Sequence, residues 1–257
     1  MHVKQAANVV DLLEFYADRK SAATLADVSQ HFGWPRSSTF NLISTLVSRG
    51  FLYEPKPRGG FYPTPRWLHL SREIASAEPV SENIRRLLEE LWDKAGETIC
   101  FTALSGQYAV FLDAIESLEA VRYSVKVGDR LPLHATASGM AILSQLTEAQ
   151  RGSILRKAKF ERHGEGTLMS VEAVEDAVRA SLLRGYFQSA SAYSRGLGGV
   201  AVPLVLGDRV FAVTIAGPLF RVENRVDEFA NLLHRVTAKH LGADYFAKNV
   251  ANLGVVS

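Results

Sequence analysis

Hydrophobic residues recur at helical spacing through the first part of the chain, and they predict three short helices there. One apolar stripe covers residues 3–16. A second helix begins after Thr24, with Asp27 three positions on in a weaker version of the capping box. Gly33 ends that helix, and the third occupies residues 36–49. Two short helices joined by a tight glycine-containing turn are typical of a helix-turn-helix.

The pattern then changes to two short apolar strands, at residues 51–53 and 61–62, joined by a turn that carries Lys56 and Arg58. Such a strand pair predicts a wing whose cationic tip reaches the phosphate backbone of DNA. The third helix presents hydroxyl, amide and guanidinium groups, which can read base edges in the major groove. The predicted DNA-binding residues are Arg36, Ser37, Ser38, Phe40, Asn41, Ser44, Thr45, Lys56 and Arg58.

Two features of the third helix stay open at the level of sequence. A face rich in serine and threonine is, taken alone, more simply explained as a solvated surface. DNA binding is favoured only because the tight turn, this helix and the basic strand pair follow one another along the chain in the order of a winged helix-turn-helix. Phe40 either packs in the core or presents an apolar surface to thymine methyl groups, because helical spacing fits both.

A further helix is predicted to begin after Pro65 and to end at Pro79, and it either links two domains or belongs to the core of the second. The elements expected after it are a helix at 81–96, strands at 98–104, 108–115 and 121–127, helices starting near 136, 147 and 171, strands at 200–206 and 210–215, and a helix at 223–241. Antiparallel strands with segregated helices predict an α+β domain. The expected domains are a winged helix-turn-helix at 1–64, a linker helix at 65–79 and a C-terminal α+β domain at 80–257.

The composition supports this two-domain organisation without identifying a function. A length of 257 residues favours two domains, and 47% hydrophobic with 22% charged residues is the balance of a globular protein with a real core. The net charge is only +2, but residues 1–66 hold eight Lys and Arg against five Asp and Glu. Positive charge is therefore concentrated in the segment with the predicted wing, although this asymmetry alone does not establish a nucleic-acid binder.

The cysteine content and the apolar stretches bear on the cellular compartment. Cys100 is the single cysteine and lies in an apolar run, so no internal disulfide is possible, which suits a reducing cytosol. The chain does not start with the basic and apolar segments of a secretion signal, and its longest apolar stretch, 199–206, is too short to cross a bilayer. We therefore expect a cytoplasmic protein with no membrane partner.

Several sequence blocks resemble the IclR-type transcriptional regulators. In the first part these blocks are LADV (25–28), PRSST (35–39), LISTL (42–46) and GFL (50–52). In the second part they are LPLHATASG (131–139), RGY (184–186), GGVAVP (198–203) and GP (217–218) with Arg221. The resemblance implies a DNA-binding domain, a linker helix and an effector-binding domain. It also implies a homodimer, often a pair of dimers, on a palindromic site in double-stranded DNA.

The chain departs from the pattern of that family at two places. Asn41 stands where the family usually has arginine, so the base preference is expected to differ. The stretch 189–195 holds small, aromatic and basic residues where the family usually has a pair of acids. Arg195 would add positive charge to a ligand site there if it points inward.

Carrying the effector site of the family onto this chain gives nine residues: Ala120, Tyr123, Ala137, Ser138, Ser189, Leu197, Gly199, Thr214 and Ala216. Small residues make room for a ligand, and the start of the helix near Ala137 offers free N–H groups that attract anions. Hydroxyl groups can orient a carboxylate or carbonyl. We expect a small organic or aromatic acid as the effector. Without the resemblance, these residues would be explained as satisfying loops and strands.

Two other classes of function compete with the regulator. One is an enzyme, hydrolase-like, using the C-terminal pocket; the other is a winged helix that binds a protein. No nucleophile elbow, phosphate loop or zinc-binding helix is present in the sequence, and no cofactor, metal site or catalytic residue is predicted. Asp113 and Glu116 form a possible carboxylate pair but are more simply solvated at the end of a strand. His134 and His163 are far apart in sequence.

Overall fold

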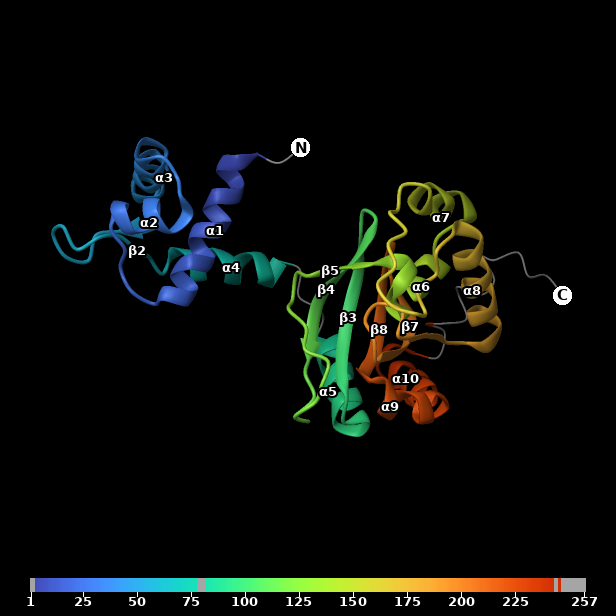
Figure 1. The fold of residues 1–257 in the computed structure, drawn as a ribbon. Coiled ribbons are helices and arrows are strands. Elements are labelled where there is room, and N and C mark those ends of the chain that lie inside the picture. The colour runs from blue at the N-terminus through green and yellow to red at the C-terminus, as the bar shows by residue number, and fades with distance from the viewer. Residues whose placement is uncertain (1–2, 78–81, 243–244, 246–257) are drawn as a thin grey trace. The chain divides into compact units, whose positions relative to one another are not determined.

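The computed structural model of the chain describes residues 3–77, 82–242 and 245 (Figure 1). These residues form two compact units, Met1–Pro79 and Val80–Ser257, each with its own hydrophobic core. No helix in the described part of the chain is long and apolar enough to cross a bilayer. We describe each unit by itself.

The first unit is a three-helix cluster followed by a small antiparallel strand pair. Its elements are α1 (Lys4–Arg19), α2 (Leu25–Phe32), α3 (Arg36–Ser48), β1 (Leu52–Tyr53), β2 (Tyr62–Pro63) and α4 (Arg66–Ala77). The three predicted helices are confirmed. Leu12, Val28 and Ile43, one from each of these helices, are buried together in the core.

The first strand is one residue shorter than predicted, and the second has the predicted length but begins one residue later. Phe51 and Phe61 lie outside β1 and β2. Phe61 instead forms an isolated bridge with Ala23, whose N–H donates to the Phe61 carbonyl at 3.0 Å and whose carbonyl accepts from the Phe61 N–H at 2.8 Å. The prediction missed this bridge because the segment before α2 carries no strand pattern of its own.

Helix α4 begins against the first unit. The Trp67 indole donates to the Phe51 carbonyl at 3.0 Å, and the two rings lie 4.3 Å apart between centroids. The Thr64 hydroxyl donates to the Gly50 carbonyl at 2.6 Å. The start of this helix therefore does not belong to the core of the second unit. The predicted helix end at Pro79 and the next helix start at Ser81 lie outside the described residues.

The second unit is an antiparallel sheet of six strands in the order β5-β4-β3-β8-β7-β6 (Figure 1). The strands are β3 (Thr98–Ser105), β4 (Tyr108–Ile115), β5 (Arg130–Pro132), β6 (Phe187–Ala190), β7 (Leu197–Leu206) and β8 (Arg209–Pro218). The helices are α5 (Glu82–Ala95), η1 (Leu133–Ala135), α6 (Ala137–Ser144), α7 (Glu148–Leu155), α8 (Val171–Arg184), α9 (Leu219–Val222), η2 (Glu223–Arg225) and α10 (Val226–Leu241). The α+β class predicted from sequence is confirmed.

Helices cover both faces of this sheet. Phe101, Val202 and Val213 pack with α5 and α10 in one buried cluster. The residues one position away on the same strands, Cys100 and Ala212 among them, pack with α6 and α8 in a second cluster. Because both faces are buried, the central strands are apolar at nearly every position, as strands covered on two sides usually are.

The predicted strand at 121–127 is wrong. These residues are irregular, and β5 at Arg130–Pro132 is the strand that pairs with β4. Side-chain bonds hold the irregular segment instead: Glu116 Oε1 accepts from the Val125 N–H at 3.1 Å, and the Thr98 hydroxyl donates to the Tyr123 carbonyl at 2.6 Å. The final helix, predicted from residue 223, begins at Val226 after the short turns of α9 and η2.

Helices α5 and α10 are tied together by one carboxylate. Glu90 Oε2 accepts from Lys239 Nζ and approaches His240 Nε2, both at 2.8 Å, while Oε1 accepts from Lys94 Nζ at 2.5 Å. The bonds from Lys239, Lys94 and His240 lower the pKa of Glu90 to about 2. The ionised form is therefore the one that the folded unit stabilises.

We expect Glu90→Gln to lower the melting temperature at neutral pH, with a gap to the wild type that closes as the pH falls. A lowered folded-state pKa contributes stability above the ordinary value of 4.5, and this contribution is lost as the pH falls toward about 2. Thermal unfolding between about pH 7 and about pH 3 measures the gap. Glu89→Gln, which removes an exposed pair with Arg85, is the control. A gap that does not change with pH would contradict the assignment.

Candidate nucleic-acid interface and ligand site

Helices α2 and α3 meet at a turn that is fixed at both ends of α2. The Thr24 hydroxyl accepts from the Asp27 N–H at 3.2 Å, and the Thr24 N–H donates to Asp27 Oδ2 at 3.0 Å, so the capping box is complete. Gly33 ends α2 with φ 65°, a conformation that favours glycine. The Phe32 and Trp34 rings stack at 4.2 Å between centroids. These contacts set the direction in which α3 leaves the turn.

Helix α3 buries one side and leaves the predicted DNA-binding side open. Thr39, Ile43 and Leu46 are buried. Six of the seven predicted residues on α3 are exposed, and the seventh, Ser44, is half-buried. Phe40 is 56% exposed, so the structure excludes a core position for its ring.

The predicted residues of α3 divide between two hollows beside the helix. One hollow, of about 520 Å³, is lined by Leu25, Ala26, Arg36, Ser37, Phe40 and Asn41. The other, of about 510 Å³, includes Ser38, Asn41 and Thr45. The Thr45 hydroxyl donates to the Asn41 carbonyl at 2.7 Å and is engaged within the helix. The structure therefore joins Arg36, Phe40 and Asn41 into one surface and places Ser38 and Thr45 beside it.

Helix α1 contributes polar residues that the sequence analysis did not select. Lys4, Gln5 and Asn8 line the second hollow together with the side of α3. The signal was present, because Lys4 and Asn8 are spaced by one helical turn and lie on the face of α1 that carries the buried residues Leu12 and Phe15 further along the helix. Only the packing of α1 beside α3 gives this spacing a meaning.

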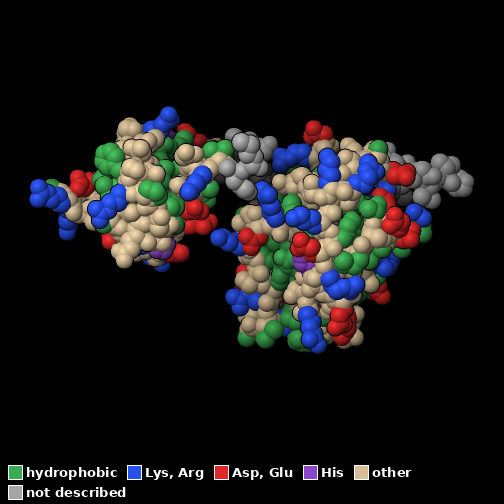
Figure 2. Space-filling model, turned by 45° about the horizontal axis from the view of Figure 1, so that its top comes forward, with side chains coloured by type: hydrophobic (Ala, Val, Ile, Leu, Met, Phe, Trp, Pro, Cys, Tyr) green, Lys and Arg blue, Asp and Glu red, His purple; other side chains and the backbone are tan. Residues whose placement is uncertain are grey.

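The loop between β1 and β2 carries its cations at an exposed tip. Lys56 and Arg58 are both exposed, and Figure 2 shows Lys and Arg side chains gathered at the end of this loop. The Arg58 N–H donates to Glu54 Oε1 at 2.6 Å, and the Gly59 N–H donates to the Lys56 carbonyl at 2.8 Å. The loop thus has a defined turn, with both cationic side chains directed to solvent.

The base of this loop is pinned to the segment before α2 by a close backbone approach. Gly60 has φ 89°, and a Cβ atom there would lie 2.5 Å from the carbonyl carbon and oxygen of Ala23. Only glycine allows this approach, which precedes the bridge between Ala23 and Phe61. The glycine therefore fixes the loop relative to the helix-turn-helix.

In the second unit, five of the predicted effector residues lie on the sheet face that α6 covers, and four of these five lie side by side. Ser189 pairs with Gly199, and Gly199 pairs with Ala216. Thr214 lies two positions from Ala216 on β8 and so shares its face. A Cβ atom at Gly199 would lie 3.4 Å from Ser189 Oγ and 3.6 Å from Thr214 Cγ2. Leu197, two positions before Gly199, belongs to the same face.

The start of α6 lies over this face. The Thr136 hydroxyl caps the helix by accepting from the Gly139 N–H at 3.0 Å. Ala137 and Ser138 follow and are buried, and their N–H groups have no partner within the helix because they belong to its first turn. A Cβ atom at Gly139 would lie 2.3 Å from the Leu133 carbonyl oxygen, so this glycine lets the helix start approach the preceding turn.

Thr214 carries an anomaly at this site. Its hydroxyl oxygen is buried and has no hydrogen-bond partner in the described part of the chain. An unpaired buried hydroxyl costs about 1–3 kcal/mol. Together with the hydroxyl of the neighbouring Ser189 and the N–H groups at the start of α6, it offers donors to an anionic or carbonyl group.

The two remaining predicted residues lie in the irregular segment after β4. Tyr123 is half-buried against the cluster under α6, and burial raises the pKa of its phenol, which stays neutral at physiological pH. Ala120 is exposed. The structure therefore brings Tyr123 to the apolar cluster, whereas Ala120 lies at the surface.

The stretch 189–195 is held by the loop before α8. The Thr167 hydroxyl donates to the Ala192 carbonyl at 2.6 Å, and the Gly166 N–H donates to the Ser191 carbonyl at 3.1 Å. Arg195 is exposed. The sequence departure in this stretch therefore adds no buried charge from Arg195 to the ligand site.

The two carboxylates considered for catalysis form hydrogen bonds with other side chains, and the two histidines lie near each other. Asp113 bonds Arg85 at 2.9 Å, and Glu116 bonds Ser124 at 2.7 Å and Arg122 at 2.9 Å; hydrogen bonds from Ser124, Arg122 and the Val125 backbone lower the pKa of Glu116. His134 and His163, distant in sequence, have ring centroids 6.2 Å apart. Among the described residues, no group of three or more His, Cys, Asp or Glu could hold a metal ion.

The chain matches two family descriptions that together cover most of its length. Residues 5–55 match the IclR helix-turn-helix domain, and residues 73–241 match the bacterial transcriptional regulator IclR C-terminal domain. Among characterised proteins, the acetate operon repressor of Salmonella typhimurium is 27% identical over 227 residues, which cover 86% of this chain and 83% of the repressor.

Solved structures share the fold across nearly the whole chain. The Thermotoga maritima IclR structure has a TM-score of 0.76 at 18% identity and covers 97% of this chain and 99% of its own. An IclR homologue of Microbacterium hydrocarbonoxydans, complexed with 4-hydroxybenzoate, has a TM-score of 0.73 at 24% identity and covers 95% of this chain and 99% of its own.

We expect Gly60→Ala to destabilise the first unit more than Gly33→Ala does. Both glycines have positive φ, so each substitution costs about 1–2 kcal/mol for the backbone alone. Only Gly60 faces backbone atoms at 2.5 Å, whereas nothing lies within 4 Å of a Cβ atom at Gly33. Thermal unfolding of the two variants measures the difference. Equal losses of stability would show that the close approach to Ala23 is not a constraint.

Proposed function

The chain belongs to the IclR family of bacterial transcriptional regulators, and we propose that it binds operator DNA under the control of a small organic or aromatic acid. One observation carries the DNA-binding part of the proposal. An exposed surface of Arg36, Phe40 and Asn41 stands on a helix-turn-helix whose adjoining loop ends in two exposed cations. This combination supplies groups for base edges and groups for phosphates.

In this proposal α3 enters the major groove and the loop between β1 and β2 contacts the backbone. Lys56 and Arg58 neutralise phosphates, which gives affinity without sequence preference. Arg36 and Asn41 read purine edges, since arginine pairs well with guanine and asparagine with adenine. The exposed Phe40 ring packs against thymine methyl groups. Asn41 in place of the usual arginine gives this chain its own base preference.

One copy of such a module contacts too little DNA for useful specificity. Two half-sites about one helical turn apart, read by a symmetric pair of modules, are the usual solution. We therefore propose that the chain acts as a homodimer or tetramer on a palindromic operator. A regulator of this kind works beside the chromosome, in the cytoplasm.

The proposed effector site is the sheet face under α6. None of its nine predicted residues is charged, so the acid is held by hydroxyl groups and by N–H groups at the start of α6 rather than by an ion pair. The Thr214 hydroxyl supports this site, because a bound acid would supply the hydrogen-bond partner that it lacks among the described residues. The 4-hydroxybenzoate complex of the Microbacterium hydrocarbonoxydans protein supports an aromatic acid as one member of the ligand class.

Control of DNA binding requires that the ligand binds two arrangements of the protein unequally. Helix α4 is the segment through which a change in the second unit passes to the first along the chain. Its start is fastened to the first unit through Trp67 in the first turn and through Thr64, two residues before the helix. We propose that α4 transmits the effect of the ligand.

We expect the double variant Lys56→Ala, Arg58→Ala to weaken binding of all DNA sequences about equally and to flatten the salt dependence. Each lost phosphate contact reduces the slope of log K against log salt by about 0.9. Fluorescence anisotropy on the region upstream of the gene for this protein, at several salt concentrations, gives the slope. The control is Arg162→Ala, an exposed cation of the second unit. An unchanged slope would count against the loop as a phosphate contact.

We expect Thr214→Val to raise the stability of the free protein and to lower its affinity for the effector. Valine keeps the shape of threonine and removes a buried hydroxyl that has no partner in the described residues. Thr98→Val is the matched control, because its hydroxyl is bonded to the Tyr123 carbonyl and its loss should destabilise. A thermal-shift screen with small carboxylic and aromatic acids measures both effects. The same ligand-induced shift in Thr214→Val and wild type would remove Thr214 from the site.

A further inference from the structure

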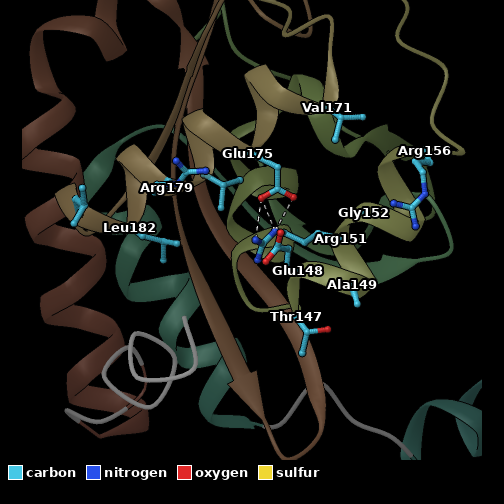
Figure 3. A pocket seen from close by; sticks show the side chains of 12 residues that line it. Thr147, Glu148, Ala149, Arg151, Gly152, Arg156, Val171, Glu175, Arg179 and Leu182 are labelled. Carbon is cyan, nitrogen blue, oxygen red and sulfur yellow. Dashed lines mark hydrogen bonds and ion pairs between the residues drawn. The ribbon is translucent and has the colours of Figure 1, made fainter. Parts of the chain in front are cut away.

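A second concave site lies between α7 and α8, outside the proposed effector site. It is a groove of about 910 Å³, lined by both helices and seen from close by in Figure 3. None of the nine predicted effector residues lines it. Its size falls within the range of about 300–1,000 Å³ that is usual for small-molecule sites.

An ion pair crosses the groove between the two helices. Arg151 Nε lies 3.1 and 3.0 Å from the two Glu175 oxygens, and its Nη1 donates to the Leu146 carbonyl at 2.8 Å (Figure 3). Arg151 is only 8% exposed. Its donors are satisfied within the protein, so this guanidinium fastens α7 to α8 and leaves the binding of a ligand to other groups.

The side of the groove formed by α8 is mostly apolar. Val171, Val178 and Leu182 line it, one helical turn or two apart, and Leu183 beside them is 78% exposed. Apolar side chains along a groove favour an occupant with an apolar body, because its contact with them removes hydrocarbon surface from water.

The side formed by α7 holds a guanidinium that has no partner among the residues that the structure describes. Gly152 sits inside this helix, where glycine is less favourable than alanine. A Cβ atom there would lie 3.0 Å from Arg156 Nη1, so the missing side chain leaves room for that guanidinium to lie along the helix. Arg156 lines the groove, and its side chain has no hydrogen bond or ion pair with any described residue.

The other charges of the groove lie away from Arg156. Glu148 opens α7 eight positions earlier, about 12 Å along the helix at 1.5 Å per residue. Arg179 stands on the opposite side of the Arg151–Glu175 pair from Arg156 in Figure 3. Its exposed contact with Asp176, at 3.6 Å, is weak. The end of the groove at Arg156 is therefore locally cationic.

We propose that this groove binds an organic anion with an apolar body, its acidic group paired with the Arg156 guanidinium and its body against Val171, Val178 and Leu182. Arginine suits the role because its planar fork holds a carboxylate or sulfonate through two parallel hydrogen bonds. This chemistry differs from the uncharged effector site under α6. The chain therefore carries a second ligand site, and that site does not depend on DNA binding.

The experiment measures binding of anilinonaphthalene sulfonate, an apolar aryl sulfonate, to the full-length protein by fluorescence. The variants are Arg156→Gln, which removes the charge, and Arg179→Gln, which removes the cation at the other end. Arg162→Gln, an exposed arginine outside the groove, is the matched control. Competition by decanoate and by decanol tests the acidic group, and a gel shift of each variant follows DNA binding separately.

We expect Arg156→Gln to raise the dissociation constant about tenfold, the loss expected for a charge-assisted pair of about 1.4 kcal/mol. The other two variants should bind like the wild type, and decanoate should displace the probe far better than decanol. Equal binding by Arg156→Gln and wild type, a loss confined to Arg179→Gln, or no binding by the wild type would each overturn the proposal. So would a change of oligomeric state in Arg156→Gln on sedimentation, which would show the groove to be a subunit contact. If the wild type bound the probe but not DNA, that result would instead count against the proposed function.

Discussion

Burial of the six-stranded sheet on both faces is the constraint on which the second unit depends. Large side chains such as Phe101 and Val213 fill the face toward α5 and α10, while Cys100 and Ala212 leave space on the other. Small residues on that face let the start of α6 come close to the strands. The approach also requires Gly139, which has backbone of the preceding turn within 2.3 Å of where its Cβ would lie. A helix start over small residues is the feature on which the proposed effector site depends.

The first unit has a different structural requirement. It must keep a few exposed side chains in a fixed arrangement. Its core is small, and the turn between α2 and α3 is fixed by the capping box at Thr24 and by the stacking of Phe32 on Trp34. The close approach of Gly60 to Ala23 then fixes the cationic loop. A ring as exposed as Phe40 contributes nothing to this core. Its exposure is explained if the surface that carries it contacts DNA, as proposed.

The two ligand sites proposed for the second unit hold an acid in different ways. At the proposed site under α6 the donors are hydroxyl and N–H groups of mostly buried residues, where an added charge would need those donors to replace water. Between α7 and α8, an exposed guanidinium meets an open apolar groove, and solvent screens the pair. Selectivity for shape therefore belongs to the first site, whereas the second favours any acid whose apolar body is long enough to cover Val178 and Leu182.

The sequence by itself determined the features that depend on neighbouring residues. Thr24 and Asp27 marked the start of α2, Gly33 marked its end, and the basic turn after α3 located the strand pair. The family resemblance supplied the effector residues, four of which the sheet register then brought together. What depends on segments far apart in the chain had to come from the tertiary structure. Residues 121–127 have the pattern of a strand but pair with no strand in the described part of the chain. Phe40 had two equally good positions until the packing of α3 exposed it. The space that Gly152 leaves for Arg156 has meaning only beside α8, because the groove exists only once the two helices are held together by Arg151 and Glu175.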